Sequence, residues 1–134
     1  MNRKPTMVLV VGENARNSRP LLQWLDGRGG RCHFARSYRD ASRLISSTNF
    51  DLVLCEYQLP DRTAFPLLGL LEGSLATLFF GTRVENGVLW LQMLERGKRS
   101  IGVPLLRSNE LPKALAAILD AAAEHPQEEP VSAG

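Results

Sequence analysis

The chain has 134 residues, of which 44% are hydrophobic, and its formal net charge is +2. This length and composition suit one folded domain with a sizeable core and exclude a chain that is disordered throughout. No stretch approaches the roughly 20 apolar residues of a membrane span, and the first apolar run, Met7–Val11, is shorter than the roughly 7–15 residues of a secretory signal.

Short apolar runs mark the candidate strands. They are continuous rather than alternating, as in strands that a parallel sheet buries on both faces. We expect strands at Met7–Val11, Cys32–Ala35, Leu52–Cys55, Leu78–Phe80 and Ile101–Leu106. The gaps between them are long enough for a helix each, so the pattern predicts repeated βαβ units and an α/β fold with helices on both faces of a parallel sheet.

The gaps carry helix signals of their own. The first helix is expected to begin near Ser18 and to end at Gly27. Ser37, with an acidic residue three positions on, resembles the start of the second helix. A short third helix is expected after Pro66, and a last helix over residues 111–122.

Two segments resemble the receiver domain of response regulators. FDLVLCEYQLPD, residues 50–61, is similar to the third receiver strand, where a phospho-accepting aspartate precedes a Leu-Pro turn; Glu56 stands at that position. VLVVGEN, residues 8–14, is similar to the first strand, which normally ends in two acidic residues that hold Mg²⁺; Gly12 and Glu13 stand there. The resemblance spans residues 7–122. It implies a doubly wound, flavodoxin-like fold, with a five-stranded parallel sheet in the order 2-1-3-4-5 flanked by helices.

Other positions of the receiver switch also depart from the family pattern. The Thr or Ser that ends the fourth strand aligns with Gly81, although a slip of one residue would supply Thr82. The aromatic switch residue aligns with Ile101, and the lysine before a proline aligns with Pro104. With that lysine missing, we expect a guanidinium from Arg62 or Arg83 to enter the pocket and pair with the carboxylates. Those carboxylates, Glu13 and Glu56, are expected to lie close enough to repel each other.

These departures predict a domain whose phosphorylation chemistry has been lost. Phosphoryl transfer needs a metal and precisely placed cations where charge develops, and an error of about 1 Å can cost on the order of 100-fold. We therefore expect no enzyme activity and no cofactor, with Mg²⁺ binding disfavoured. Glu56 is either an imitation of the phosphorylated state or a remnant of a former site, and we favour the remnant.

The function expected is that of a stand-alone, cytoplasmic signalling domain that binds another protein without being phosphorylated. The domain is expected over residues 1–124, followed by a disordered tail at 125–134. Two alternatives stay open: a weakly phosphorylated receiver that accepts a phosphoryl group from a histidine kinase, and a small-ligand sensor. Cys32 and Cys55 show no metal spacing and are expected to be reduced core thiols.

The partner surface is expected on a fourth helix over residues 85–96. Its apolar side chains would span an arc of roughly 200°, about twice the stripe of an ordinary surface helix. The proposed contact residues are Leu89, Trp90, Met93 and Leu94. A second signalling protein or another copy of this chain would bind there. No membrane contact is expected, nor direct contact with nucleic acid, because the arginines between positions 28 and 43 are not interleaved with enough aromatic residues. The alternative is that Trp90 simply lies in the core.

Overall fold

The computed structural model describes residues 6–13, 19–85, 87–100, 106–107 and 110–124. Four helices and seven strands lie within those residues: β1 (Thr6–Val11), α1 (Arg19–Gly27), β2 (Gly30–Ala35), α2 (Tyr38–Ser47), β3 (Leu52–Glu56), α3 (Leu67–Leu71), β4 (Thr77–Val84), β5 (Gly87–Glu95), β6 (Lys98–Arg99), β7 (Leu106–Arg107) and α4 (Leu111–Glu124). None of these helices is long and apolar enough to cross a membrane.

All the strands belong to one mixed sheet. Its first four strands lie in the order β2-β1-β3-β4 and pair in parallel. Next to β4 lies β5, which runs antiparallel to it, and both β6 and β7 pair with the far side of β5. The doubly wound α/β class and the order of the first four strands are confirmed. The sheet has seven strands rather than five, however, and only its first half is parallel.

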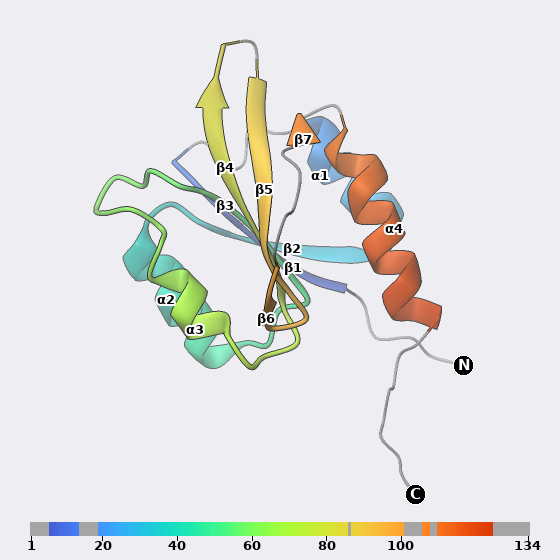
Figure 1. Ribbon diagram of the computed structural model, residues 1–134, viewed down its shortest axis with the longest axis horizontal. Helices are drawn as coiled ribbons and strands as arrows, with labels where there is room; N and C mark the ends of the chain where they lie inside the picture. The colour runs from blue at the N-terminus through green and yellow to red at the C-terminus, as the bar shows by residue number, and fades with distance from the viewer. Residues whose placement is uncertain (1–5, 14–18, 86, 101–105, 108–109, 125–134) are drawn as a thin grey trace, which may run out of the picture.

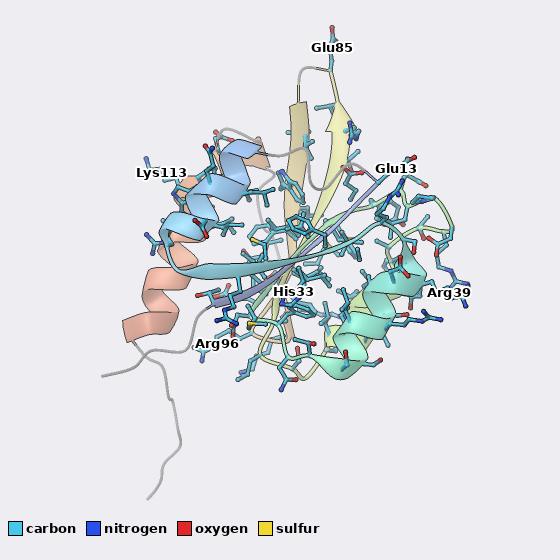
Figure 2. The ribbon with its side chains drawn as sticks, turned by 180° about the vertical axis from the view of Figure 1, so that it is seen from behind. Glu13, His33, Arg39, Glu85, Arg96 and Lys113 are labelled. Atoms are coloured by element: carbon cyan, nitrogen blue, oxygen red, sulfur yellow. The ribbon has the colours of Figure 1, made fainter. Side chains whose placement is uncertain are left out.

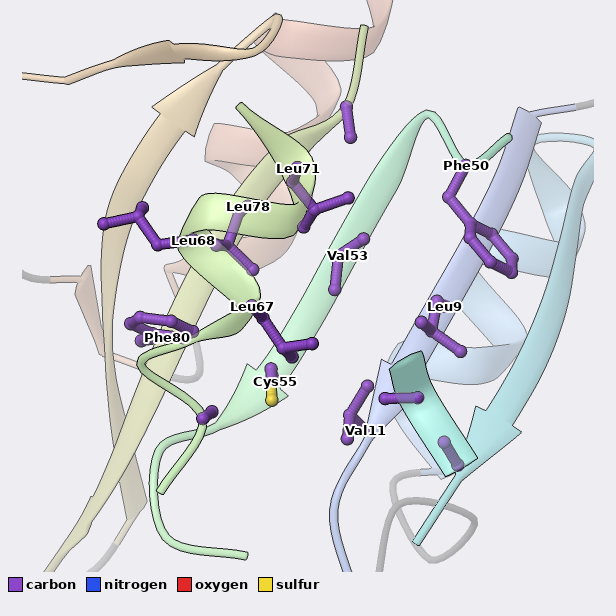
Figure 3. Close-up of a cluster of buried hydrophobic side chains, with 14 of the residues drawn as sticks. Leu9, Val11, Phe50, Val53, Cys55, Leu67, Leu68, Leu71, Leu78 and Phe80 are labelled. Atoms are coloured by element: carbon purple, nitrogen blue, oxygen red, sulfur yellow. The ribbon is translucent and has the colours of Figure 1, made fainter. Parts of the chain in front are cut away.

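The helices form a layer on each face of the sheet (Figure 1). Between the sheet and α2 and α3 lies one buried apolar cluster, which includes Leu9, Val53 and Phe80 (Figure 3). A second cluster lies on the opposite face and joins Val10, Leu54 and Trp90 to α1 and α4. The continuous apolar runs of the sequence are therefore explained by burial on both faces of β1 and β3.

The predicted helix over residues 85–96 is wrong, because this segment forms β5. Val84 pairs with Gly87, so β4 and β5 form a hairpin with a two-residue connection. Asn-Gly at positions 86 and 87 is the strongest short-range hairpin signal, and the periodicity argument passed over it. The broad apolar arc reflects a strand that is covered on one face and partly covered on the other.

Correcting the helix also corrects the proposed contact face. Trp90 is only 8% exposed and packs in the cluster beside α4, whereas Leu94 is fully buried in the opposite cluster. Leu89 and Met93 are half-buried. These four residues therefore form no single helical surface, and the alternative that placed Trp90 in the core is the one observed.

The expected fifth parallel strand is replaced at the same end of the sheet. Residues 101–105, with Ile101 and Pro104, lie outside the described residues. Leu106 belongs to the short strand β7, which pairs with β5 alone and antiparallel to it. This end of the run thus lies at the edge of the sheet, as the proline led us to expect. The tail expected at 125–134 also lies outside the described residues.

Candidate functional site

The residues that align with the receiver phosphorylation site meet at the carboxyl end of the parallel strands. Val11, the last residue of β1, is in register with Cys55 of β3, so Gly12 and Glu56 follow side by side. Glu56 is in turn in register with Gly81 of β4. Gly12 donates its amide to the carbonyl of Ala35 at the end of β2, with an N–O distance of 2.9 Å. The backbone of the site therefore keeps the arrangement that the resemblance predicted.

The side chain of Glu56 lies directly over Gly12. A Cβ atom built on Gly12 would come within 2.8 Å of the Glu56 Cδ atom and 3.1 Å of its Oε1 atom. Real Cβ atoms do not approach other heavy atoms so closely. Glu56 consequently fills the space that an aspartate at position 12 would need, so the missing acid and the longer acid are two halves of one rearrangement.

The carboxylate of Glu56 is bound by Arg83, one of the two arginines predicted to enter the pocket. Arg83 Nη2 donates to Glu56 Oε2 at 2.9 Å, and the two side chains are 61% and 20% exposed. An ion pair this open to solvent contributes about 0.2–1 kcal/mol. Arg62 lies elsewhere: its guanidinium carbon is 5.0 Å from the centre of the Tyr38 ring, in a cation–π contact.

The position expected to hold the switch hydroxyl is filled by an indole ring. Gly81 is buried and in register with Trp90, and a Cβ on Gly81 would lie 2.8 Å from the Trp90 ring. Thr82, the alternative from a one-residue slip, is exposed. Because side chains alternate along a strand, Thr82 points to the other face of the sheet from the Gly81–Trp90 contact. Neither candidate brings a hydroxyl to Glu56.

The loop after Glu56 is fixed by an acid that the sequence analysis did not single out. Asp61 accepts hydrogen bonds from the amides of Tyr38 and Arg39, at 2.9 and 3.0 Å, and so caps α2 beside Ser37, which accepts from Asp40 N. The bond from Tyr38, more than any other contact, lowers the pKa of the Asp61 carboxyl below its ordinary value. An aspartate just after a Leu-Pro turn was a visible signal, but its target, 22 residues earlier in the sequence, was not.

The described residues do not fit the Mg²⁺ that the receiver resemblance implies. Position 12 supplies no carboxylate, and that of Glu56 is bound by Arg83. Glu13 is exposed in the turn after β1; its predicted repulsion of Glu56 stays a prediction. Within the described part of the chain, no group of three or more His, Cys, Asp or Glu side chains could hold a metal ion.

Both thiols lie in places that disfavour the thiolate. Burial raises the pKa of Cys55, and the neighbouring Glu56 charge raises it further. Cys55 donates its thiol hydrogen to the carbonyl oxygen of Glu56, with an Sγ–O distance of 3.2 Å. Burial and Asp26 likewise raise the pKa of Cys32. Such thiols are weak nucleophiles, which agrees with a structural role in the core.

Comparison with known proteins identifies the fold. No protein-family model and no curated protein sequence matches the chain. Among solved structures, the signal receiver domain of an HD domain-containing protein from Pseudomonas fluorescens Pf-5 is 22% identical, with a TM-score of 0.59 over 94% of this chain and 100% of that one. A two-component response regulator from Clostridium difficile is 18% identical, with a TM-score of 0.60 over 86% and 96% of the two chains.

The receiver (REC) domain of the PhyR response regulator from Erythrobacter litoralis is also similar, at 14% identity and a TM-score of 0.55, over 96% of this chain and 97% of that one. At identities this low the likeness establishes the fold alone. The chain has the fold of a response-regulator receiver domain, and the resemblance seen in the sequence is confirmed at that level.

Proposed function

We propose that this chain acts in signal transduction as a receiver-like domain that binds another protein and is not switched by phosphorylation. The observation that carries the proposal is the position of the Glu56 side chain, which fills the space over Gly12 and pairs with Arg83. Binding rather than catalysis would be its role, in the cytoplasm, where the partners of such domains act.

The chemistry of phosphoryl transfer supports this proposal. A carboxylate that accepts a phosphoryl group needs a metal to neutralise the phosphoryl oxygens and donors placed where charge develops. At Gly12 there is no ligand for a metal, and at Gly81 the space for a switch hydroxyl is occupied by Trp90. A phosphoryl group on Glu56 would also have to displace the guanidinium that already binds its carboxylate.

The Arg83 contact bears on the two interpretations of Glu56. An imitation of the phosphorylated state needs a cation that reads the negative charge, and Arg83 occupies such a position. A carboxylate nevertheless carries one charge and two oxygens, against about 1.5–2 charges and three oxygens for a phosphoryl group. We therefore keep the remnant as the favoured interpretation, with Glu56 retained as the partner of Arg83.

Phosphorylation can be tested by intact-mass spectrometry after incubation with acetyl phosphate and Mg²⁺ at neutral pH. We expect no added phosphoryl mass on the wild type. The matched control is Glu56→Gln, which removes the candidate acceptor. An added phosphoryl mass on the wild type that disappears in Glu56→Gln would overturn the proposal. It would favour the alternative of a weakly phosphorylated receiver, for which the partial exposure of Glu56 is the supporting observation.

A further inference from the structure

The antiparallel hairpin leaves one face of β5 without a covering helix. On the first face, Trp90 packs among the residues of α4, where Leu111 and Leu115 are buried. On the second face, α2 and α3 pack over β1, β3 and β4. No helix among the described residues covers β5 there, and Leu89, Leu91 and Met93 stay half-buried.

The neighbouring surface of α3 is also apolar. Leu70 on α3 is 46% exposed, and Leu75, which follows it, is 71% exposed. We call the set Leu70, Leu75, Leu89, Leu91 and Met93 the β5 surface. Its lower end is closed by the turn between β5 and β6, because Gly97 donates its amide to Ala76 O at 2.9 Å and accepts from Gly73 N at 3.0 Å.

That turn gives the β5 surface a basic end. Arg96 and Lys98 flank Gly97 and are exposed, and within the described part of the chain no carboxylate forms an ion pair with either of them. Arg99, the next basic residue, donates from Nε to Glu72 Oε2 at 2.7 Å. An apolar strip that ends in unneutralised positive charge is complementary to an apolar segment that carries negative charge at one end.

Size and spacing indicate what kind of segment fits. Five partly covered side chains offer on the order of a few hundred Å² of apolar area, well below the about 800 Å² per partner of a standard interface between folded proteins. Alternate residues of a strand are about 7 Å apart, close to the roughly 5.4 Å rise of a helical turn. A helix lying along β5 would thus place about one side chain per turn against Leu89, Leu91 and Met93.

From these observations we infer that the β5 surface binds an amphipathic helix of a partner protein, with acidic residues at the end that reaches Arg96 and Lys98. The helix would take the place left empty beside α3 and would cover β5 much as α4 covers its other face. The inference rests on the proposed function only in that the ligand is a protein. It needs nothing from Glu56, so phosphorylation of the wild type would overturn the proposed function and leave this surface unaffected.

A displayed peptide library tests the inference without knowledge of the partner. The peptides are helical, with leucine along one face and Glu, Lys or Ser allowed equally elsewhere, and selection uses the full chain with counter-selection against Leu75→Glu. We expect Glu to be enriched at one end of the helix. No enrichment, or enrichment of Lys, would overturn the inference.

The selected peptide then provides a quantitative measurement by fluorescence anisotropy. We expect Leu75→Glu and Lys98→Glu each to weaken binding by about tenfold or more, and added salt to weaken it further. Lys113→Glu, an exposed charge reversal on α4 (Figure 2), is the matched control and should bind like the wild type. Equal losses in all three variants, or a dimer in light scattering that Leu75→Glu abolishes, would overturn the partner-helix assignment.

Discussion

At the residue scale, Gly12 and Glu56 have complementary sizes. Receivers place an acidic side chain on each of these two strands, whereas here one residue has no side chain and the other has an extra methylene group that lies over it. Either change alone would leave a void or a clash. The pair accordingly behaves as one unit, and substitutions at the two positions should not be additive.

The first prediction follows from this pairing. Gly12→Asp should destabilise the wild type by about 1–3 kcal/mol, the usual cost of overpacking, and the cost should fall in the Glu56→Ala background. Urea denaturation of the four proteins in the cycle provides the measurement. Equal effects of Gly12→Asp in both backgrounds would show that Glu56 does not occupy this space.

A second prediction concerns the cap that Asp61 provides for α2. The pKa of Asp61 is lowered by its hydrogen bonds in the fold, so the carboxylate contributes stability above its unfolded pKa of about 3.9. That contribution disappears as the pH falls through the lower folded value. The melting temperature of Asp61→Asn should lie below that of the wild type at pH 7, and the difference should shrink below about pH 4. Asp26→Asn, an exposed change outside the cap, is the control; a difference that persists at pH 3 would contradict the assignment.

At the element scale, two tight turns replace the crossover helix of the parallel pattern. Arg96 and Gly97 have φ angles of 56° and 78°, the left-handed pair typical of a two-residue hairpin turn. A Cβ atom on Gly97 would lie 1.9 Å from the carbonyl oxygen of Ser74. The close approach that glycine permits allows the turn to hydrogen-bond to the segment after α3.

The third prediction compares two glycines with similar backbone angles. Gly29 has a φ of 81° and nothing within 4 Å of a built Cβ atom, so Gly29→Ala should cost only the left-handed strain of about 1–2 kcal/mol. Gly97→Ala should cost more, because Ser74 must move as well. Thermal unfolding of both variants measures the difference, and equal losses would mean that the Gly97 contact is not tight.

The fourth prediction tests the wall that replaces the switch hydroxyl. Gly81→Thr restores the family residue but drives its side chain into Trp90 and Val88. We expect the variant to be destabilised by about 1–3 kcal/mol and the indole emission to shift to longer wavelength as Trp90 moves toward water. Trp24→Phe is the background for the measurement, since it leaves Trp90 as the sole indole. An unchanged spectrum and stability would contradict the packing described.

At the scale of the whole molecule, the parallel half of the fold was predictable and the antiparallel half was not. Buried parallel strands are apolar on both faces, so β1, β3 and β4 are visible as continuous runs. The run at Val88–Leu94 is equally apolar, and periodicity alone does not separate a buried strand from a helix of that length. The sequence also identified Gly12, Glu56 and Arg83, but the contact of Glu56 with Gly12 depends on side-chain direction, which strand spacing does not specify.

The fifth prediction concerns closure of the second layer by α4. Leu115 is fully buried in the cluster that contains Trp90, so Leu115→Ala should cost about 2–5 kcal/mol and make the indole of Trp90 accessible to acrylamide. Lys113→Ala on the exposed side of the same helix should do neither. A Leu115→Ala variant as stable as the wild type would show that α4 does not hold this layer in place.

The hairpin also changes the order in which the chain can assemble. A parallel strand pairs only after the chain has crossed over a helix, whereas β4 and β5 meet across two residues, and β6 follows β5 across another two-residue turn. Contacts between residues close in sequence carry a small loop-closure entropy, and hairpins form in about 1–10 μs. Residues 77–99 therefore have the topology of a folding nucleus, onto which β3 and β1 dock later. Kinetic φ-values that are higher in Phe80 and Leu94 than in Leu9 would follow from this order, and the opposite ranking would exclude it.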